Sequence, residues 1–224
     1  MGQRQRLKDK FVNIIIRDII AGKYPAGSVL PSERELAEQL GMSRTVVRSG
    51  LAELSAIQLI ETLDRKGSIV QDIQSNASLP VLNAILSSQG QLYPELMKGF
   101  LEARSLIELE TARLAALNRS DEDLYQLYGI IRKEQKLPNG SELELAKFSF
   151  KFHRQIARAS GNPIYPIFLS SMQPTYEVLL IQYYEQGITP KEMCVLHKSM
   201  YDAILSRQPE KAQEAMKNIL TYKV

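Results

Sequence analysis

Residues 22–70 read GKYPAGSVLPSERELAEQLGMSRTVVRSGLAELSAIQLIETLDRKGSIV, and this stretch decides the fold of the N-terminal part of the chain. Ser32 stands three residues before Glu35, which is the spacing of a reciprocal cap at the start of a helix. Gly41 can adopt the positive φ angle that ends this short helix, and Ser43 can cap a second one. Two short helices joined by a turn of about three residues are a helix-turn-helix.

The second of these helices is expected to run from Ser43 to about Leu54 and to present a cationic face. Its valines and leucines recur at helical spacing and would face a core. Arg44, Thr45 and Arg48 project from other positions near its N-terminal end. That end of a recognition helix enters the major groove of DNA, where an arginine can donate two hydrogen bonds to guanine O6 and N7.

A helix precedes this pair and a hairpin follows it. Apolar residues recur every three or four positions over residues 7–20, which predicts an amphipathic helix that Gly22 ends. Residues 59–63 and 68–71 are expected to form two short strands around the basic turn 64–67. The N-terminal part is therefore expected to be a winged helix-turn-helix with a small β wing.

Length and composition are those of an ordinary globular chain with two domains. The chain has 224 residues, of which 44% are hydrophobic and 24% charged, and its formal net charge is +3. This charge is too small by itself to indicate nucleic acid. The polar residues 72–80 lack hydrophobic periodicity and predict a linker, so we place the two domains at residues 1–74 and 75–224.

The sequence also bears on the compartment. No apolar run reaches the roughly 20 residues that span a bilayer, so we expect a cytoplasmic protein without a membrane partner. The single cysteine, Cys194, excludes an intrachain disulfide, and we interpret it as a half-buried apolar residue of a helix.

The C-terminal part has helical periodicity throughout, and we expect a mainly α protein whose second domain is an all-α bundle of six to seven helices. The expected helices lie near residues 80–88, 92–117, 121–136, 141–159, 163–185, 190–206 and 209–222. Helix-capping patterns support three of these starts: Ser120 with Asp123, Asn162 before Pro163, and Thr189 with Glu192.

Residues 22–70 resemble the winged helix of the GntR family of bacterial transcription regulators. In that family the LPSEREL segment opens the first helix of the motif, SRTVVR opens the recognition helix, and the wing has a basic tip with a glycine; all three are present in order. One departure concerns Ser49 and Gly50, where the family usually has Glu-Ala. Glycine costs about 1 kcal/mol against alanine inside a helix, so this helix is either less rigid or closely packed at Gly50.

The resemblance implies a set of DNA contacts. Arginines would contact bases or phosphates, hydroxyl groups would contact phosphates, and the wing would reach the minor groove or its backbone. The residues concerned are Arg34, Arg44 and Arg48, then Ser43 and Thr45, and finally Arg65, Lys66 and Gly67. The alternative interpretation is that Arg34 and Arg48 pair with Glu33, Glu38 or Glu53 on solvated helix faces.

Residues 80–222 resemble the ligand-binding bundle, or FCD domain, of the FadR-like subfamily. The matching segments are EARSLIELETARLAALNRSDEDL, FKFHRQIARASGNPIY and LHKSMYDAILSRQPEKAQEAM. The resemblance implies a small organic acid as effector, held by Arg104 with Ser149, His153 and His197, because an arginine can clamp a carboxylate through two hydrogen bonds.

Many members of that subfamily hold a divalent metal through one aspartate and three histidines. The corresponding positions here are Ser149, His153, His197 and Ile219, so two of the four ligands are missing. A divalent metal would therefore depend on His153 and His197 together with water and a bound carboxylate.

Structural interpretations stand beside these functional ones. The two histidines would be core residues that bond to neighbours such as Ser149, and Arg104 would form a surface pair with Glu108 four residues later. Asn162 would be a helix cap. For the tyrosines we favour core positions over a cavity lining; they are Tyr165, Tyr176, Tyr183 and Tyr184.

The resemblance implies a homodimer that binds two half-sites of double-stranded operator DNA and is released by its effector, which makes it a repressor. One alternative is a regulator whose bundle serves only for dimerisation. A more distant alternative is an enzyme that uses His153 with Ser149 or His197, but no accompanying catalytic motif supports it.

Overall fold

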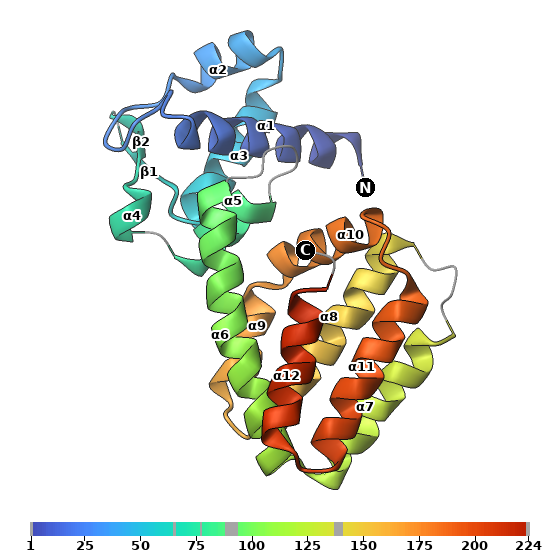
Figure 1. The fold of residues 1–224 in the computed structure, drawn as a ribbon. Helices are drawn as coiled ribbons and strands as arrows, with labels where there is room; N and C mark the ends of the chain where they lie inside the picture. The colour runs from blue at the N-terminus through green and yellow to red at the C-terminus, as the bar shows by residue number, and fades with distance from the viewer. Residues whose placement is uncertain (1, 65, 77, 88–93, 137–140, 223–224) are drawn as a thin grey trace. The chain divides into compact units, whose positions relative to one another are not determined.

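A computed structural model of the chain describes residues 2–64, 66–76, 78–87, 94–136 and 141–222. Contacts divide the chain into two compact units, Met1–Tyr93 and Pro94–Val224. The described residues are mainly helical with one small sheet, as the sequence predicted (Figure 1). None of their helices combines the length and the apolar character needed to cross a bilayer.

The first unit begins with a winged helix-turn-helix, which consists of α1 (Gln3–Ile20), α2 (Glu33–Leu40), α3 (Arg44–Ala56), β1 (Ile60–Leu63) and β2 (Gly67–Val70). Two short helices follow it in the same unit, α4 (Ile73–Asn76) and α5 (Leu79–Ser87).

The caps of the helix-turn-helix are those that the sequence predicted. At the start of α2 the Ser32 amide donates to Glu35 Oε2 at 2.8 Å, and the Glu35 amide donates to Ser32 Oγ at 3.3 Å. Gly41 ends α2 with φ 62° and ψ 34°, and Ser43 Oγ accepts the Val46 amide at the start of α3. Side-chain caps therefore satisfy amides that lack a partner in the first turn of each helix.

The wing is a two-stranded antiparallel hairpin in which Ile60 pairs with Val70 and Leu63 with Gly67. The second strand begins at Gly67, whose φ is 86°, one residue before the predicted start. A further segment lies along β2 through an isolated bridge between Val29 and Ile69, which the sequence analysis did not predict.

Gly50 allows α1 and α3 to pack closely. A Cβ atom at this position would lie 2.2 Å from Cδ1 of Phe11, whose side chain is fully buried. Of the two interpretations of Gly50 left open by the sequence, the structure supports close packing.

The segment after the wing differs from the predicted linker, because α4 adds a single helical turn at Ile73–Asn76. The Ser75 hydroxyl donates to Asp72 Oδ2 at 2.6 Å, a local side-chain bond of the kind that begins a turn. Helix α5 packs against α1 within the first unit. The domain boundary expected between residues 74 and 75 stays a prediction.

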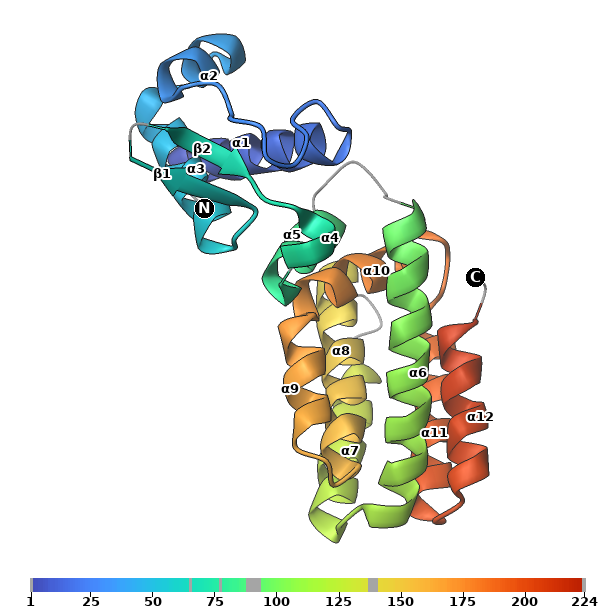
Figure 2. The same cartoon turned by 90° about the vertical axis from the view of Figure 1, so that its left-hand side faces the viewer.

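The second unit is a helical bundle. Among its described residues the helices are α6 (Pro94–Asn118), α7 (Asp121–Glu134), α8 (Glu142–Ala159), α9 (Ile164–Ser171), α10 (Gln173–Glu185), α11 (Pro190–Leu205) and α12 (Pro209–Leu220). Helix α8 contacts α6, α7, α9 and α10, and α12 packs against α6 and α11 (Figure 2). Residues of α6, α7, α8 and α11 thereby meet inside the bundle.

One predicted helix, residues 163–185, is wrong as a single element. The helix is interrupted at Met172, whose φ of −99° and ψ of 8° depart from helical values, and α10 begins directly after this residue. Pro174 in the first turn of α10 explains the break, because a proline lacks the amide that would continue the preceding helix.

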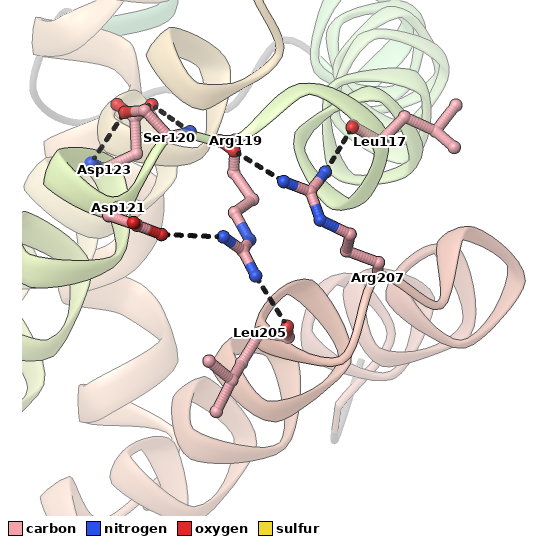
Figure 3. A network of polar contacts seen from close by, with 7 residues as sticks. All are labelled: Leu117, Arg119, Ser120, Asp121, Asp123, Leu205 and Arg207. Carbon is pink, nitrogen blue, oxygen red and sulfur yellow. Dashed lines mark hydrogen bonds and ion pairs between the residues drawn. The ribbon is translucent and has the colours of Figure 1, made fainter.

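Two arginines join the turn after α6 to the turn after α11 (Figure 3). Arg207 donates to the carbonyl oxygens of Leu117 at 2.6 Å and Arg119 at 3.3 Å. Arg119 in turn donates to the Leu205 carbonyl at 3.0 Å and to Asp121 at 3.0 Å. Arg207 thus bonds carbonyl oxygens at the C-terminal end of α6, and Arg119 bonds one at the C-terminal end of α11. Carbonyl groups at these helix ends lack intrahelical partners.

Candidate functional site

The first candidate site is the exposed N-terminal turn of α3. Ser43, Arg44, Thr45 and Arg48 are all exposed there, while Val46 and the following valine turn into the core. The capping hydroxyl of Ser43 and the helical spacing of the two arginines put these polar groups on one surface of the first unit. Such a surface can donate hydrogen bonds to phosphates and base edges.

Two of the arginines expected to contact DNA, Arg48 of α3 and Arg34 of α2, form ion pairs with neighbouring carboxylates. Arg48 donates through Nε and Nη2 to the Glu33 carboxylate, with Nη2 2.9 Å from Oε2. This hydrogen bond lowers the pKa of Glu33 and raises that of Arg48. Arg34 lies 4.0 Å from Glu38 on the exposed face of α2. The surface pairs weighed as an alternative therefore form in the DNA-free chain, and DNA phosphates would have to replace them.

The wing tip completes this surface in part. Lys66 and Gly67 are exposed. Arg65, the third wing residue expected to contact DNA, lies outside the described residues.

The second candidate site is a buried polar cluster in the second unit. Arg104 Nε donates to Glu108 Oε1 at 2.6 Å, with both side chains at most 2% exposed. The Tyr176 hydroxyl bonds the same oxygen, and His153 Nδ1 bonds Glu108 Oε2. The pairing of Arg104 with Glu108 was expected on a helix surface; it forms, but inside the bundle.

Neighbouring charges fix the protonation of this cluster. Burial alone would raise the pKa of Glu108, but His153 and Arg104 outweigh it and lower this pKa to about 2. Burial acts to lower the pKa of Arg104, and the Glu108 carboxylate outweighs it, so the guanidinium stays charged. For His153, burial prevails and lowers the pKa. At neutral pH the cluster therefore contains a guanidinium, a carboxylate and a neutral imidazole.

A second histidine–carboxylate pair lies next to the first. His197 Nδ1 is 2.7 Å from Glu134 Oε2, and both side chains are at most 1% exposed. The His197 ring stacks on Phe152 with centroids 4.1 Å apart, and its centroid is 6.0 Å from that of His153. The bundle thus brings together the two histidines that the sequence singled out.

Glu134 also lines a pocket of about 710 Å³ between the end of α7 and the first turns of α11. Thr189, Cys194 and Lys198 contribute to the same lining. The carboxylate that holds His197 is therefore adjacent to this pocket.

The four positions of the implied metal site hold only two metal ligands. Ser149 Oγ bonds the Tyr184 hydroxyl at 3.0 Å, so it contacts a tyrosine instead of the histidines suggested from the sequence. Ile219 is buried and apolar. Within the described ranges, no three residues among histidine, cysteine, aspartate and glutamate gather closely enough to hold a metal ion. The residues present do not fit a resident four-ligand metal.

Several buried polar atoms of the cluster lack a hydrogen-bond partner among the described residues. They include Nη1 and Nη2 of Arg104, Nε2 of His153, Nε2 of His197 and Oε1 of Glu134. Buried polar atoms are usually hydrogen-bonded, so these atoms leave room for partners such as water or a bound ligand.

Sequence reasoning missed Glu134 and underrated Glu108. Helical periodicity could have found Glu134, because Leu127, Ile131 and Glu134 share one face of α7 and the first two are core residues. Glu108 stands on the buried face of α6, one turn after Arg104. At Glu108 and at Glu134, a carboxylate on an otherwise apolar helix face is the sequence signal that could have indicated a buried polar residue.

The core interpretation fits three of the four tyrosines. Tyr176, Tyr183 and Tyr184 are buried, and Tyr165 is half-buried. Asn162 Oδ1 accepts the Ile164 amide at 2.9 Å, the first amide of α9, although Pro163 and not Asn162 stands at the N-cap position of this helix.

Cys194 is half-buried, as the sequence analysis expected. Burial raises the pKa of its thiol to about 12, so the reactive thiolate form is disfavoured at neutral pH.

Comparisons with known proteins match both parts of the chain. The family described as "Bacterial regulatory proteins, gntR family" matches residues 7–70, and the FCD domain matches residues 100–222.

Among curated relatives, the fatty acid metabolism regulator protein of Shewanella denitrificans is 32% identical over 162 residues, which covers 72% of this chain and 66% of that protein. The Glc operon transcriptional activator of Escherichia coli K12 is 30% identical over 227 residues, covering 96% and 87%.

Among solved structures, the Listeria monocytogenes regulator Lar, described as controlling expression of the agr system, superposes with a TM-score of 0.63 at 15% identity, covering 98% of this chain and 94% of that one. This likeness supports the fold alone.

Proposed function

Because the chain belongs to the GntR family of bacterial regulatory proteins and carries an FCD domain, we propose that it represses transcription and that a small organic acid controls its affinity for operator DNA. The family consists of transcription regulators, so an enzyme that uses His153 and His197 is set aside. The observation that carries the proposal is the exposed N-terminal turn of α3, with Arg44, Thr45 and Arg48 on one surface.

The proposed DNA contacts follow from that surface. Arg44 donates to base edges or phosphates, and Arg48 exchanges the Glu33 carboxylate for a DNA phosphate. Exposed ion pairs contribute little stability, so this exchange costs little. Ser43, Thr45, Arg34 and the wing contact the flanking backbone.

The proposed effector site is the buried cluster around Arg104. Its guanidinium binds the carboxylate of the acid, and the two histidines contact the rest of the molecule. The effector shifts DNA affinity only through its different affinities for the two states of the regulator. We propose a homodimer on a two-fold operator, acting in the cytoplasm where the DNA is.

A dimerisation-only bundle is the second candidate, and one observation favours it. Arg104 already has a carboxylate partner in Glu108, so its charge is satisfied without a ligand. A screen of small acids for a rise in melting temperature separates the two candidates, since a ligand that binds the folded state raises its stability.

Selection from a random duplex library tests DNA binding without knowledge of the operator. The wild-type chain is expected to enrich a two-fold symmetric sequence, and Arg44→Ala is expected to lose about 1–3 kcal/mol of affinity for it. The matched control is Arg154→Ala, an exposed arginine of α8, which should bind as wild type does. Enrichment of no sequence, or equal losses in both variants, would contradict the proposal.

A further inference from the structure

The bundle contains a pocket that is separate from the buried cluster around Arg104. Helices α7 and α11 lie side by side (Figure 1), and a pocket of about 710 Å³ lies between the end of α7 and the first turns of α11. Sites for small molecules have volumes of about 300–1,000 Å³. Arg104, His153 and His197 are not among the described residues that line this pocket. Its size therefore suits a small molecule that does not contact the proposed effector cluster.

The lining of this pocket is mainly apolar. Pro190 and Val195 contribute hydrocarbon groups, and Cys194 contributes a thiol, which behaves as a small apolar group while it is protonated. Lys191 and Lys198 add the aliphatic stems below their charged ends. Val195 is 63% exposed, so a ligand that covers it removes apolar surface from water. The lining therefore selects a ligand whose body is apolar.

One buried polar atom of the lining is available for a hydrogen bond. Glu134 is 1% exposed, and its Oε2 lies 2.7 Å from His197 Nδ1. Its Oε1 is also buried and has no hydrogen-bond partner within the described ranges. The Cys194 thiol interacts with the same carboxyl, but a thiol is a weak donor. Because a buried polar atom without a partner is costly, the polar group of a ligand is most favourably placed at Glu134 Oε1.

The charges of the lining exclude a cationic ligand and an acid at Glu134. An amine would add a third cation to those of Lys191 and Lys198, which are both exposed members of the lining. A carboxylate at Glu134 Oε1 would bring two acidic groups together away from water. The polar group at Glu134 is therefore expected to be neutral.

A hydroxyl group meets these requirements. It is neutral, it is small enough to leave the rest of the ligand apolar, and it can both donate and accept a hydrogen bond. It donates to an ionised carboxylate and accepts from a protonated one, so it fits Glu134 in either form.

We propose that the pocket between α7 and α11 is a second ligand site, which binds a small neutral alcohol with an apolar body. The hydroxyl group bonds Glu134 Oε1, and the body covers Val195 and Pro190. This site goes beyond the effector cluster proposed above and does not depend on it.

The thiol of Cys194 reports on this pocket, because it is the only cysteine of the chain and belongs to the lining. The rate at which a maleimide alkylates the full chain is measured by intact mass with and without benzyl alcohol, 2-phenylethanol or cyclopentanol. Each alcohol is compared at equal concentration with the hydrocarbon that lacks only the hydroxyl group: toluene, ethylbenzene or cyclopentane. At least one alcohol is expected to slow alkylation about fivefold or more relative to its hydrocarbon. Equal or better protection by every hydrocarbon, or no protection by any alcohol, would overturn the proposal.

A matched pair of variants tests the location of the site. Val195→Trp places a large ring at the pocket and is expected to abolish the difference in alkylation rate that the alcohol causes. The control is Ile167→Trp, at an apolar position of α9 that is 64% exposed, against 63% for Val195, and it should keep wild-type protection. Melting curves show whether each variant folds, and Val195→Phe replaces a tryptophan variant that does not. Wild-type protection in the folded Val195 variant would overturn the assignment.

A third variant keeps this inference apart from the proposed function. Arg104→Lys changes the proposed acid site and should leave protection of Cys194 by the alcohol unchanged; loss of protection in the folded variant would overturn a separate site. Operator selection by a wild-type chain that no alcohol protects would overturn the inference and leave DNA binding standing. Protection in a chain that selects no DNA would support the inference and overturn the regulatory function.

Discussion

At residue 50, inside α3, the absence of a Cβ atom lets α1 pack closely against this helix. The nearest ring atom of Phe11 occupies the position that a Cβ would take, at 2.2 Å from it. The helix-propensity cost of Gly50 is about 1 kcal/mol, and it is offset by the burial of Phe11 between α1 and α3.

Replacing Gly50 with alanine is therefore expected to destabilise the first unit although alanine favours helices. Overpacking costs about 1–3 kcal/mol, and a Cβ only 2.2 Å from a ring atom puts this site toward the upper end, above the propensity gain. The measurement is the urea midpoint of unfolding, followed by circular dichroism.

Two further variants control this experiment. Ser49→Ala, at the exposed neighbouring position, should shift stability by no more than about 0.5 kcal/mol. Phe11→Leu introduced together with Gly50→Ala should recover part of the loss, since it removes the clashing ring atoms. A stabilised Gly50→Ala variant would show that the packing interpretation is wrong.

His153 makes stability depend on pH. Its pKa is lowered in the folded chain below the ordinary 6.5, so the unfolded chain binds a proton that the folded chain does not. Its contribution is fully present above pH 6.5 and is lost as the pH falls from there toward the lowered pKa, with a slope of at most about 1.4 kcal/mol per pH unit.

Denaturant titrations between pH 7.5 and pH 5 check this dependence. Wild type is expected to lose stability over this range, and His153→Gln is expected to have a smaller slope. The carboxyl of Glu108 titrates lower, with a pKa near 2, so it contributes little here. Equal slopes in the two proteins would mean that His153 is not the group responsible.

The residues of the buried site were only partly predictable. Arg104, His153 and His197 were identified through a resemblance, and the structure brings the two histidines together. Whether the Arg104–Glu108 pair is exposed depends on which face of α6 meets α8, and one sequence carries no direct record of that packing. Ser149 bonds Tyr184, a residue 35 positions later, for the same reason.

At the scale of elements, the arginines after α6 and α11 stabilise helix ends. Arg207 has a φ of 53°, in the left-handed region, and its side chain bonds the carbonyl oxygens of Leu117, in the last turn of α6, and of Arg119, just after it. The backbone conformation and the side-chain bonds have opposite effects on stability.

Two substitutions at Arg207 separate these effects. Arg207→Ala keeps the strained backbone and loses the side-chain bonds, so we expect a loss of about 1 kcal/mol at this exposed position. Arg207→Gly also loses the bonds but relieves the left-handed strain, which amounts to about 1 kcal/mol or more. The glycine variant is therefore expected to melt above the alanine variant and close to wild type.

Thermal melting of the three proteins measures the difference. Identical melting of the alanine and glycine variants would mean that the backbone at residue 207 is not strained. An alanine variant as stable as wild type would mean that the side-chain bonds contribute nothing.

Local signals predicted the elements well wherever caps mark their ends. Ser32, Ser43, Ser120 and Thr189 all accept the amides that their positions predicted. The break at Met172 was missed because proline fits a first helical turn as well as it disrupts an interior. The bridge of Val29 to β2 was missed because a lone pairing outside a strand leaves no periodic pattern.

At the scale of the whole molecule, the proposed function requires that two sites influence each other. Under this proposal DNA binds the first unit and the effector binds the second, so any effect between them is a coupling free energy. Such a coupling has the same value whichever ligand binds first. This equality holds for every physical route by which the units communicate, and it makes the regulatory proposal quantitatively testable.

If the effector weakens operator affinity by a given factor, saturating operator must weaken effector affinity by the same factor. Typical couplings of about 1–3 kcal/mol correspond to roughly 5- to 150-fold. Operator affinity is measured by fluorescence anisotropy with and without effector, and effector affinity by calorimetry with and without operator. Arg104→Lys should lower effector affinity while leaving operator affinity without effector unchanged. Unequal factors would show that the effector acts outside this equilibrium, for instance by changing the dimer concentration. Factors of one in both directions would mean that the bundle binds its ligand without changing operator affinity.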